Sequence, residues 1–141
     1  MLLLSSIHRA SAALCGHLER AVLSRADLNW SDFVTLWCLW IFGDLEICVL
    51  AIETGIAKST LSNILTRLEA RNLVIRRARD GKRRLLIAGL TESGDELMSD
   101  LFPYFNAEET RAVESLSARQ IQSATNVLRA VISAVAQIAP R

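Results

Sequence analysis

The clearest chemistry in this sequence lies between Ala57 and Thr91, where basic side chains gather. Nine basic and two acidic residues give this segment a net charge of +7, whereas the whole chain has +1 and the remainder therefore −6. The basic residues are Lys58, Arg67, Arg71, Arg76, Arg77, Arg79, Lys82, Arg83 and Arg84. Charge polarised in this way indicates a surface that meets a polyanion. The competing interpretation is that the charges merely keep an exposed hairpin hydrated.

A polar face accompanies these charges on a helix predicted from Lys58 to Arg71. The face carries Ser59, Asn63 and Thr66, flanked by Ser62 and Arg67. Hydroxyl and amide groups can both donate to and accept from base edges, and a major groove about 12 Å wide admits a helix. We therefore expect Asn63 to make a bidentate contact with adenine and Lys58 to neutralise phosphate, whereas Arg67 can do either.

Apolar residues on the opposite face of this helix support it. They recur at helical spacing as Leu61, Ile64, Leu65 and Leu68. A shorter helix is predicted from Leu45 to Thr54, and Gly55 ends it because glycine accepts left-handed backbone. Ala51 is small where two helices must cross closely, and the wedge between them is filled by Leu50, Ile56, Leu61 and Ile64. Together these features predict a helix-turn-helix.

Two strands are predicted to follow, over Val74 to Arg79 and over Arg84 to Leu90. Asp80-Gly81 between them is a hairpin turn signal, and Asn72 can end the preceding helix in left-handed backbone. The basic residues at the tip of this wing are Lys82, Arg83 and Arg84. We expect them to contact a minor groove. The predicted fold is mainly α, an α+β winged helix-turn-helix that binds nucleic acid.

Further helices are predicted on both sides of the winged segment. Near the start, apolar residues at spacings of three and four form a stripe of Ile7, Ala10, Leu14, Leu18, Ala21 and Val22. A second helix, capped by Ser31, runs to Phe42 and is apolar on nearly every side, so we expect it to be buried. Thr91 can cap a long helix, and Ser117 with Gln120 forms a capping box before the last one.

The last helix carries a second apolar stripe. It consists of Ile121, Ala124, Leu128, Val131, Ile132, Val135 and Ile138. Because the middle segment is expected to close its own core, the first and last stripes need another apolar surface. A second copy of the chain can supply that surface, so we expect a homodimer. The alternative is that the two stripes pack on each other in a monomer.

Composition excludes several other classes of protein. The three cysteines are an odd number without CxxC spacing, which argues against a disulfide framework or a zinc site and fits a reducing compartment. The start lacks the basic region of a secretion signal, and no apolar run reaches the roughly 18 residues that span a bilayer, so we expect a cytoplasmic protein. His8 and His17 lack plausible partners, and we expect no enzyme, no metal and no cofactor.

Two segments resemble the MarR family of bacterial winged-helix regulators. Leu50 to Arg77, LAIETGIAKSTLSNILTRLEARNLVIRR, is similar to the family's core, and Leu90 to Gly94, LTESG, is similar to the junction before its long fifth helix. The resemblance implies an N-terminal dimerisation helix in residues 1–30, a winged domain in 31–91 and C-terminal dimerisation helices in 92–141. It also implies a homodimer that binds a pseudo-palindromic operator in double-stranded DNA. Such regulators are usually repressors that a small ligand or oxidation releases.

Carried over by position, the resemblance implies specific DNA contacts. Those of the recognition helix are Lys58, Ser59, Thr60, Ser62, Asn63 and Arg67, and those of the wing are Arg83 and Arg84. Asn72 stands where the family usually has Gly, and asparagine tolerates the same backbone. Lys82 stands where the family usually has a wing Asp, and Asp80 comes two residues early. The register of the wing contacts is therefore open.

The resemblance also suggests where a signal enters. Trp30 or Trp37 can form the wall of a pocket for an aromatic or lipophilic ligand, although buried core is the alternative. Cys15 is a candidate redox sensor, because one branch of the family senses organic peroxides with a cysteine near the start of the first helix. The tyrosine pair expected of that branch is missing, and the alternative is that Cys15 is a small buried residue. Cys38 and Cys48 are expected in the core. A winged helix used only for protein interaction would have a neutral or apolar recognition face, which this sequence lacks.

Overall fold

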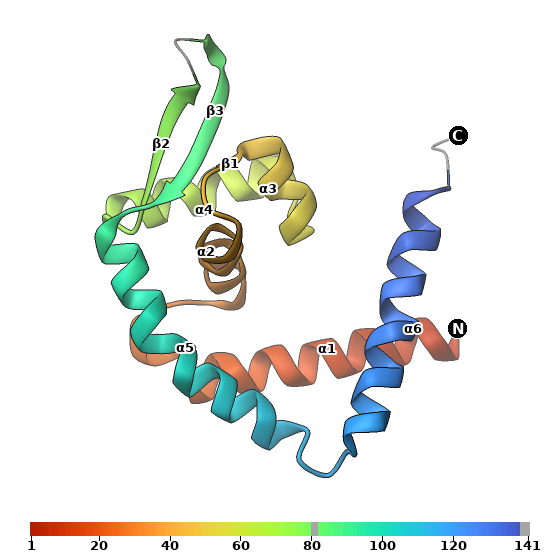
Figure 1. The fold of residues 1–141 in the computed structure, drawn as a ribbon. Coiled ribbons are helices and arrows are strands. Elements are labelled where there is room, and N and C mark those ends of the chain that lie inside the picture. Colours follow the sequence, from red (N-terminus) through yellow and green to blue (C-terminus); the bar gives the residue numbers. More distant parts are fainter. Residues whose placement is uncertain (80–81, 139–141) are drawn as a thin grey trace. The chain divides into compact units, whose positions relative to one another are not determined.

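Helices dominate the computed structural model, which describes residues 1–79 and 82–138, except the side chains of residues 79 and 82–84. In chain order the elements are α1 (Leu2–Ala21), the 3₁₀ helix η1 (Leu23–Ala26), α2 (Trp30–Phe42), β1 (Leu45–Glu46), α3 (Ile47–Thr54), α4 (Lys58–Ala70), β2 (Val74–Arg79), β3 (Lys82–Leu90), α5 (Glu92–Ala112) and α6 (Ala118–Ala136) (Figure 1). The chain divides into two compact units, Met1–Glu109 and Thr110–Arg141.

The start of α2 differs from the sequence prediction. Asn29 caps the helix, not Ser31: its side chain accepts a 2.8 Å hydrogen bond from the Asp32 backbone N–H. The Asp32 carboxylate accepts in return from the Asn29 N–H at 3.2 Å, which completes a capping box. The observed cap differs from the predicted one because a capping box needs a side-chain acceptor at the third helical position. Asp32 occupies that position only when Asn29 is the cap. Gly43, at φ 76°, ends α2 directly after Phe42, the predicted last residue of the helix.

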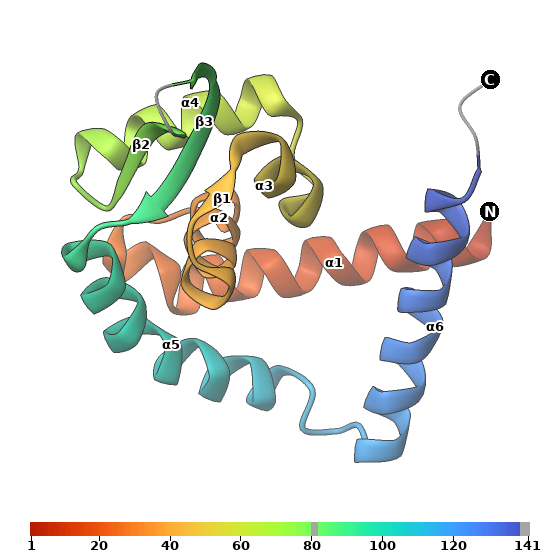
Figure 2. The ribbon, with the colours of Figure 1, turned by 45° about the horizontal axis from the view of Figure 1, so that its top comes forward.

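The sheet has three antiparallel strands in the order β1-β3-β2. β2 and β3 form the predicted wing, a long hairpin that extends past α4 in Figure 1. The sequence analysis missed β1, since it assigned Leu45 and Glu46 to the following helix. These residues pair with Ala88 and Ile87 and lead directly into α3 (Figure 2). Two residues are too few for an alternating pattern to show.

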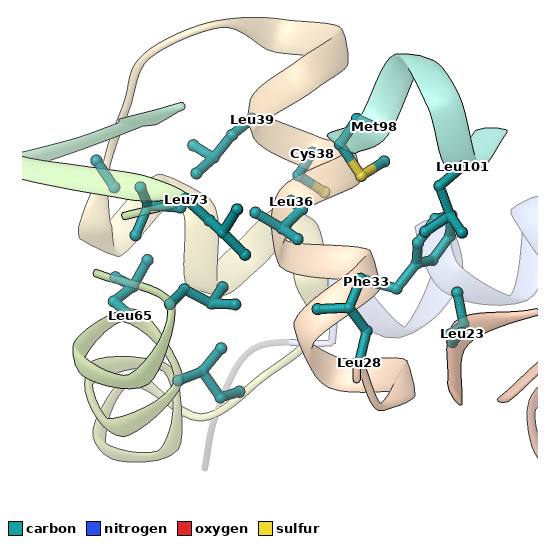
Figure 3. Packing of buried hydrophobic residues seen from close by; sticks show 14 of the residues in the cluster. Leu23, Leu28, Phe33, Leu36, Cys38, Leu39, Leu65, Leu73, Met98 and Leu101 are labelled. Carbon is teal, nitrogen blue, oxygen red and sulfur yellow. The ribbon is translucent and has the colours of Figure 1, made fainter. Parts of the chain in front are cut away.

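A single hydrophobic core fills the first unit (Figure 3). Leu36 of α2, Leu61 of α4 and Met98 of α5 are all fully buried, and burying a side chain of this size stabilises the fold by about 1.5–3 kcal/mol. Leu18 of α1 and Val22, the residue that follows α1, also belong to this core. The expectation that the middle segment closes its core alone is therefore wrong. Only the part of the α1 stripe before Leu14 lacks a place in it.

The second unit contains α6, whose start has the predicted capping box. Ser117 Oγ accepts from the Gln120 N–H at 3.2 Å, and Gln120 Oε1 accepts from the Ser117 N–H at 2.8 Å. No residue of α6 is buried in the chain. Its apolar stripe includes Ile132, 69% exposed, and Val135, 61% exposed. An exposed apolar stripe of this kind is typical of an interaction surface.

Candidate nucleic-acid interface

α3 and α4 form the predicted helix-turn-helix. The two helices meet at an angle of 105°, within the range of roughly 90–120° for this motif. Gly55 ends α3 in left-handed backbone at φ 68°. Leu50 and Leu61 are fully buried between the helices, and Ile64 is 3% exposed. Three of the four predicted wedge residues are therefore buried in the core, and the fourth, Ile56, packs against it half-buried.

The outer face of α4 is polar and exposed. Its exposed residues include five predicted DNA contacts, Lys58, Ser59, Thr60, Ser62 and Asn63. Behind this face, Leu61, Leu65 and Leu68 are fully buried. Thr66 is less available than predicted, because its hydroxyl donates to the Ser62 carbonyl at 3.0 Å and accepts from Arg76 Nη2 at 3.0 Å. The structure thus gathers short polar side chains on one exposed face of α4, and side chains of this kind can both donate to and accept from base edges.

Arg67 differs from the other predicted contacts because it has a partner within the chain. Its Nη2 donates to Asp32 Oδ1, and this ion pair joins α4 to the first turn of α2. Asp32 is only 3% exposed, whereas the Arg67 side chain is 49% exposed. The sequence analysis had no means of finding this partner, which lies 35 positions earlier in the chain.

Three further arginines of the basic segment are also bound inside the chain. Arg71 donates to the Asp27 and Ala26 carbonyls at 2.7 and 2.8 Å, which satisfies the end of η1. Arg76 and Arg77 pair with Glu69 and Asp44, respectively. Asp32 and Asp44 lie outside the segment 57–91, so counting these two partners lowers its charge from +7 to +5. The positive surface is therefore smaller than the sequence suggests.

Glu69 and Arg76 join α4 to β2. Arg76 donates to Glu69 Oε2 from Nη2 at 2.8 Å and from Nε at 3.2 Å, and its backbone N–H donates to Oε1 at 3.0 Å. The side-chain bonds, followed by the backbone bond, hold the pKa of the Glu69 carboxyl below its ordinary value. This pair fixes the wing against the recognition helix.

The base of the wing depends on Asp44, which lies between α2 and β1. Asp44 accepts from Arg77 Nη2 of β2. Gly89 of β3 leaves room for this carboxylate, since a Cβ at that position would lie 2.1 Å from Asp44 Oδ1. The strand register shifts between Ala78 and Arg79. The predicted turn at Asp80-Gly81 and the side chains of Lys82, Arg83 and Arg84 lie outside the described residues.

The predicted wing joins α5 through the LTESG segment. Thr91 Oγ1 accepts from the Gly94 N–H at 3.0 Å, so Thr91 caps α5 as predicted. A Cβ on Gly94 would lie 2.1 Å from the Leu73 carbonyl oxygen. Asn72, just before, has the predicted left-handed backbone with φ 57°. The junction therefore requires glycine at position 94 for space, and a residue tolerant of positive φ at position 72.

The cysteines and histidines differ in part from prediction. Cys38 is buried, and burial followed by the charge of Glu53 raises the pKa of its thiol. Cys48 is exposed, with Sγ 3.8 Å from Glu46 Oε2, so its assignment to the core is wrong. Cys15 is half-buried, 3.9 Å from Ser11 Oγ; its redox role stays a prediction. His17 does have a partner, because its Nε2 lies 2.8 Å from Glu108 Oε1.

The tryptophans lie in or beside the core. Trp30 packs on Phe33 and Phe105 with ring centroids 6.0 and 6.3 Å away, and Trp37 is half-buried against the core cluster. A hollow of about 220 Å³ lies elsewhere, between the start of α3, α4 and the wing, and includes Lys58 and Ser62 in its lining. The ligand pocket at Trp30 and Trp37 stays a prediction.

In the part of the chain that the structure describes, no group of three or more His, Cys, Asp and Glu side chains is placed to hold a metal ion. Within residues 1–79 and 82–138, no single helix has the length and apolar content to cross a bilayer; α3 and α4 reach that threshold only as a bent pair, by length and composition.

Comparison with known proteins decides the family. The MarR family model matches residues 28–86. The uncharacterised HTH-type transcriptional regulator YwaE of Bacillus subtilis is 30% identical over 127 residues, covering 90% of this chain and 74% of that protein. The chain belongs to the MarR family. The HTH-type transcriptional repressor NicR of Pseudomonas putida is 32% identical over 128 residues, which cover 83% of this chain and 81% of NicR. As a MarR-family member the chain is a helix-turn-helix transcriptional regulator and not an enzyme.

Solved structures of MarR-family regulators have the same fold. AbsC from Streptomyces coelicolor matches with a TM-score of 0.82 at 27% identity, over 95% of this chain and 92% of AbsC. A mutant of E. coli MarR bound to operator DNA matches with a TM-score of 0.84 at 18% identity, over 93% and 94% of the two chains. NadR in complex with 4-hydroxyphenylacetate matches with a TM-score of 0.75 at 24% identity, over 95% and 92%. The last two, below 25% identity, show likeness of fold alone.

Proposed function

We propose that this chain is a homodimeric DNA-binding regulator, acting as a repressor of nearby genes, that reads a pseudo-palindromic operator. The observation that carries the proposal is the exposed polar face of α4, with Ser59, Ser62 and Asn63, held from behind by the fully buried Leu61, Leu65 and Leu68. The E. coli MarR structure, which contains operator DNA, supports this use of the fold. A protein-interaction module would not need hydroxyl and amide groups on this face.

The proposed contacts divide into readers and anchors. Ser59, Thr60, Ser62 and Asn63 read base edges, and Lys58 neutralises phosphate. The wing anchors the minor groove with Lys82, Arg83 and Arg84. In this scheme residues 31–91 bind DNA, while residues 1–30 and 92–141 provide the dimer. Since α1 contributes Leu18 to the core of the first unit, its dimer contacts come from its exposed N-terminal part.

The first experiment is a gel shift with the DNA immediately upstream of the chain's own gene. Operator DNA should bind in preference to a scrambled duplex of the same composition, and affinity should fall steeply with salt because phosphate contacts release counterions. The variant Asn63→Ala should lose about 1–3 kcal/mol and relax specificity at one base pair, whereas Lys82→Ala should weaken all duplexes alike. Equal weak binding to both duplexes would refute the proposal.

The dimer rests on the apolar stripe of α6. Ile132 is 69% exposed in the single chain, so a charge there is harmless to a monomer but costly in a dimer interface. Ile132→Asp should convert the protein to a monomer by sedimentation and weaken operator binding. Ser133→Asp, one residue away on the polar face of the same helix, is the matched control and should stay dimeric. A monomeric wild type would refute this part of the proposal.

The proposed effector is a small lipophilic or aromatic ligand. The NadR structure contains 4-hydroxyphenylacetate, and a BpsR structure concerns regulation of its DNA binding by 6-hydroxynicotinic acid. We place the site beside Trp30 and Trp37, which lie at the edge of the aromatic core. Titration with 4-hydroxyphenylacetate or salicylate should change tryptophan fluorescence and release operator DNA. Unchanged fluorescence in the wild type would count against this site.

A further inference from the structure

The ion pair of Asp32 and Arg67 joins the core to the edge of the recognition face, the exposed polar face of α4 that carries Ser59, Ser62 and Asn63. On α4, Arg67 follows Asn63 by one turn, so the two side chains are neighbours on the helix surface. The Arg67 side chain is 49% exposed, while the Asp32 side chain is 4% exposed. The Arg67 guanidinium therefore binds a buried carboxylate and is itself partly exposed to solvent, beside the residues proposed to read DNA.

Asp32 holds this position firmly. Its Oδ2 accepts from the Asn29 N–H at 3.2 Å, and its own N–H donates to Asn29 Oδ1 at 2.8 Å, so the carboxylate is fixed by the capping box of α2. The remaining oxygen, Oδ1, accepts from Arg67 Nη2. A buried carboxylate is tolerated only when it is paired and hydrogen-bonded. The acid is thus an immobile anchor, and Arg67 is the mobile group that it restrains.

A restrained arginine is a better phosphate ligand than a free one. The guanidinium is a planar fork with five N–H donors, and within the described residues the one hydrogen bond recorded for it goes to Asp32 through Nη2. Its other donors lie on the half-exposed side chain. Holding a long side chain in one conformation before binding removes entropy that would otherwise be lost on contact.

We propose that Asp32 is a positioning residue for DNA binding, which orients Arg67 so that the exposed edge of its guanidinium contacts a phosphate at the border of the recognition helix. Asp32 itself does not touch DNA. The proposal rests on the DNA-binding function proposed above. It assigns a role in recognition to the first turn of α2, a part of the chain that the helix-turn-helix pattern does not include.

The test compares three variants for binding to the upstream operator duplex over a series of salt concentrations. Asp32→Asn keeps the shape and the acceptor for the Asn29 N–H but removes the charge that orients Arg67. The double variant D32N/R67Q replaces the ion pair by two neutral amides, which avoids leaving Asp32 buried and unpaired. Asn29→Ala is the matched control, because it removes the side-chain acceptor of the capping box but keeps the backbone N–H of residue 29 that donates to Asp32 Oδ2. Circular dichroism and melting curves confirm that each variant folds.

If the proposal is right, D32N should bind operator about tenfold more weakly at moderate salt. D32N/R67Q should lower the slope of log affinity against log salt by about 0.9, the value for one lost phosphate contact, and should bind within about threefold of D32N. Asn29→Ala should melt at a lower temperature yet bind within about twofold of the wild type with an unchanged salt slope. A purely structural role for the pair would not move the salt slope.

Three results would overturn the inference. If the salt slope of D32N/R67Q equals that of the wild type, Arg67 contacts no phosphate. If D32N binds operator more tightly than the wild type, Asp32 holds Arg67 away from DNA. If Asn29→Ala loses as much operator affinity as D32N, the loss of affinity in D32N comes from the disturbed helix cap. Failure of the wild type to prefer operator over scrambled DNA refutes the proposed function instead, so the two failures are distinguishable.

Discussion

Thr91 Oγ1 donates a 2.6 Å hydrogen bond to the carbonyl oxygen of Asn72, and the Thr91 N–H donates at 3.1 Å to the carbonyl of the next residue, Leu73. These two bonds join the start of α5 to the chain that leaves α4. The same junction carries the left-handed backbone of Asn72 and the close approach of Gly94. The position of the recognition helix is therefore coupled to the helix that leads toward the second unit.

Gly94→Ala should destabilise the protein strongly. The new Cβ would lie 2.1 Å from the Leu73 carbonyl oxygen, a backbone atom that can move only if the junction opens. We expect a loss of about 2 kcal/mol or more, at the upper part of the range for overpacking, measured by urea unfolding. Gly16→Ala is the control, since its Cβ would meet only the flexible end of Arg20 at 3.2 Å. That change in α1 should be neutral or stabilise by up to about 1 kcal/mol, and equal losses in both variants would contradict the argument.

Substitutions at Asn72 should follow the cost of left-handed backbone. Its φ of 57° is open to glycine and costs most L-residues about 1–2 kcal/mol. We expect Asn72→Gly to stay within about 0.5 kcal/mol of the wild type and Asn72→Ala to lose about 1 kcal/mol by urea unfolding. The backbone bonds of residue 72 are retained in both variants. An alanine variant as stable as the glycine variant would show that the helix end adapts its conformation.

The Glu69–Arg76 pair should make a contribution to stability that depends on pH. Arg76 holds the pKa of Glu69 below 4.5, so the folded-state pKa is lower than the unfolded one. Its contribution is therefore fully present above about pH 4.5 and is lost as the pH falls through the folded value. Because the pair is partly exposed, the contribution stays below about 1 kcal/mol. The difference in urea midpoint between wild type and Glu69→Gln should be present at about pH 7 and should shrink as the pH is lowered below about 4.5; a difference independent of pH would contradict this.

The three cysteines should react with thiol reagents in the order of their exposure. Cys48 is exposed, Cys15 is half-buried and Cys38 is buried with a raised thiol pKa. Since the thiolate is the reactive form, Cys38 should label only when the protein unfolds. Labelling with Ellman's reagent should show a fast phase that Cys48→Ser removes and Cys38→Ser leaves unchanged. A fast phase that survives in Cys48→Ser would assign it to Cys15 and strengthen the redox interpretation of that residue.

Local patterns predicted the recognition helix well. The buried residues Leu61, Ile64, Leu65 and Leu68 all lie where the helical period placed them, because a half-buried helix leaves a strong periodic signal. The end of α4 at Asn72 and the cap of α5 at Thr91 were also predicted correctly. In each case the determining interactions lie within a few residues along the chain.

Longer-range features escaped the sequence analysis. The two-residue strand β1 exists only because β3 lies beside it, and the partners of Arg67 and Arg77 lie 35 and 33 positions away. Counting charges along the segment could not reveal that Asp32 and Asp44 fold back onto it. The choice of Asn29 over Ser31 as helix cap depended on Asp32, because both residues are good caps on their own.

The arginines engaged inside the chain also bear on how a regulator searches a genome. Non-specific attraction to DNA is almost wholly electrostatic and competes with the operator at every other site. Arg71, Arg76 and Arg77 each bind a carboxylate or a carbonyl oxygen. In the proposed regulator, fewer mobile cations remain to hold random sequence. The protein is therefore expected to dissociate faster from non-operator DNA. The side chains of α4 proposed to read bases are not engaged by these arginines, so binding to the operator is favoured.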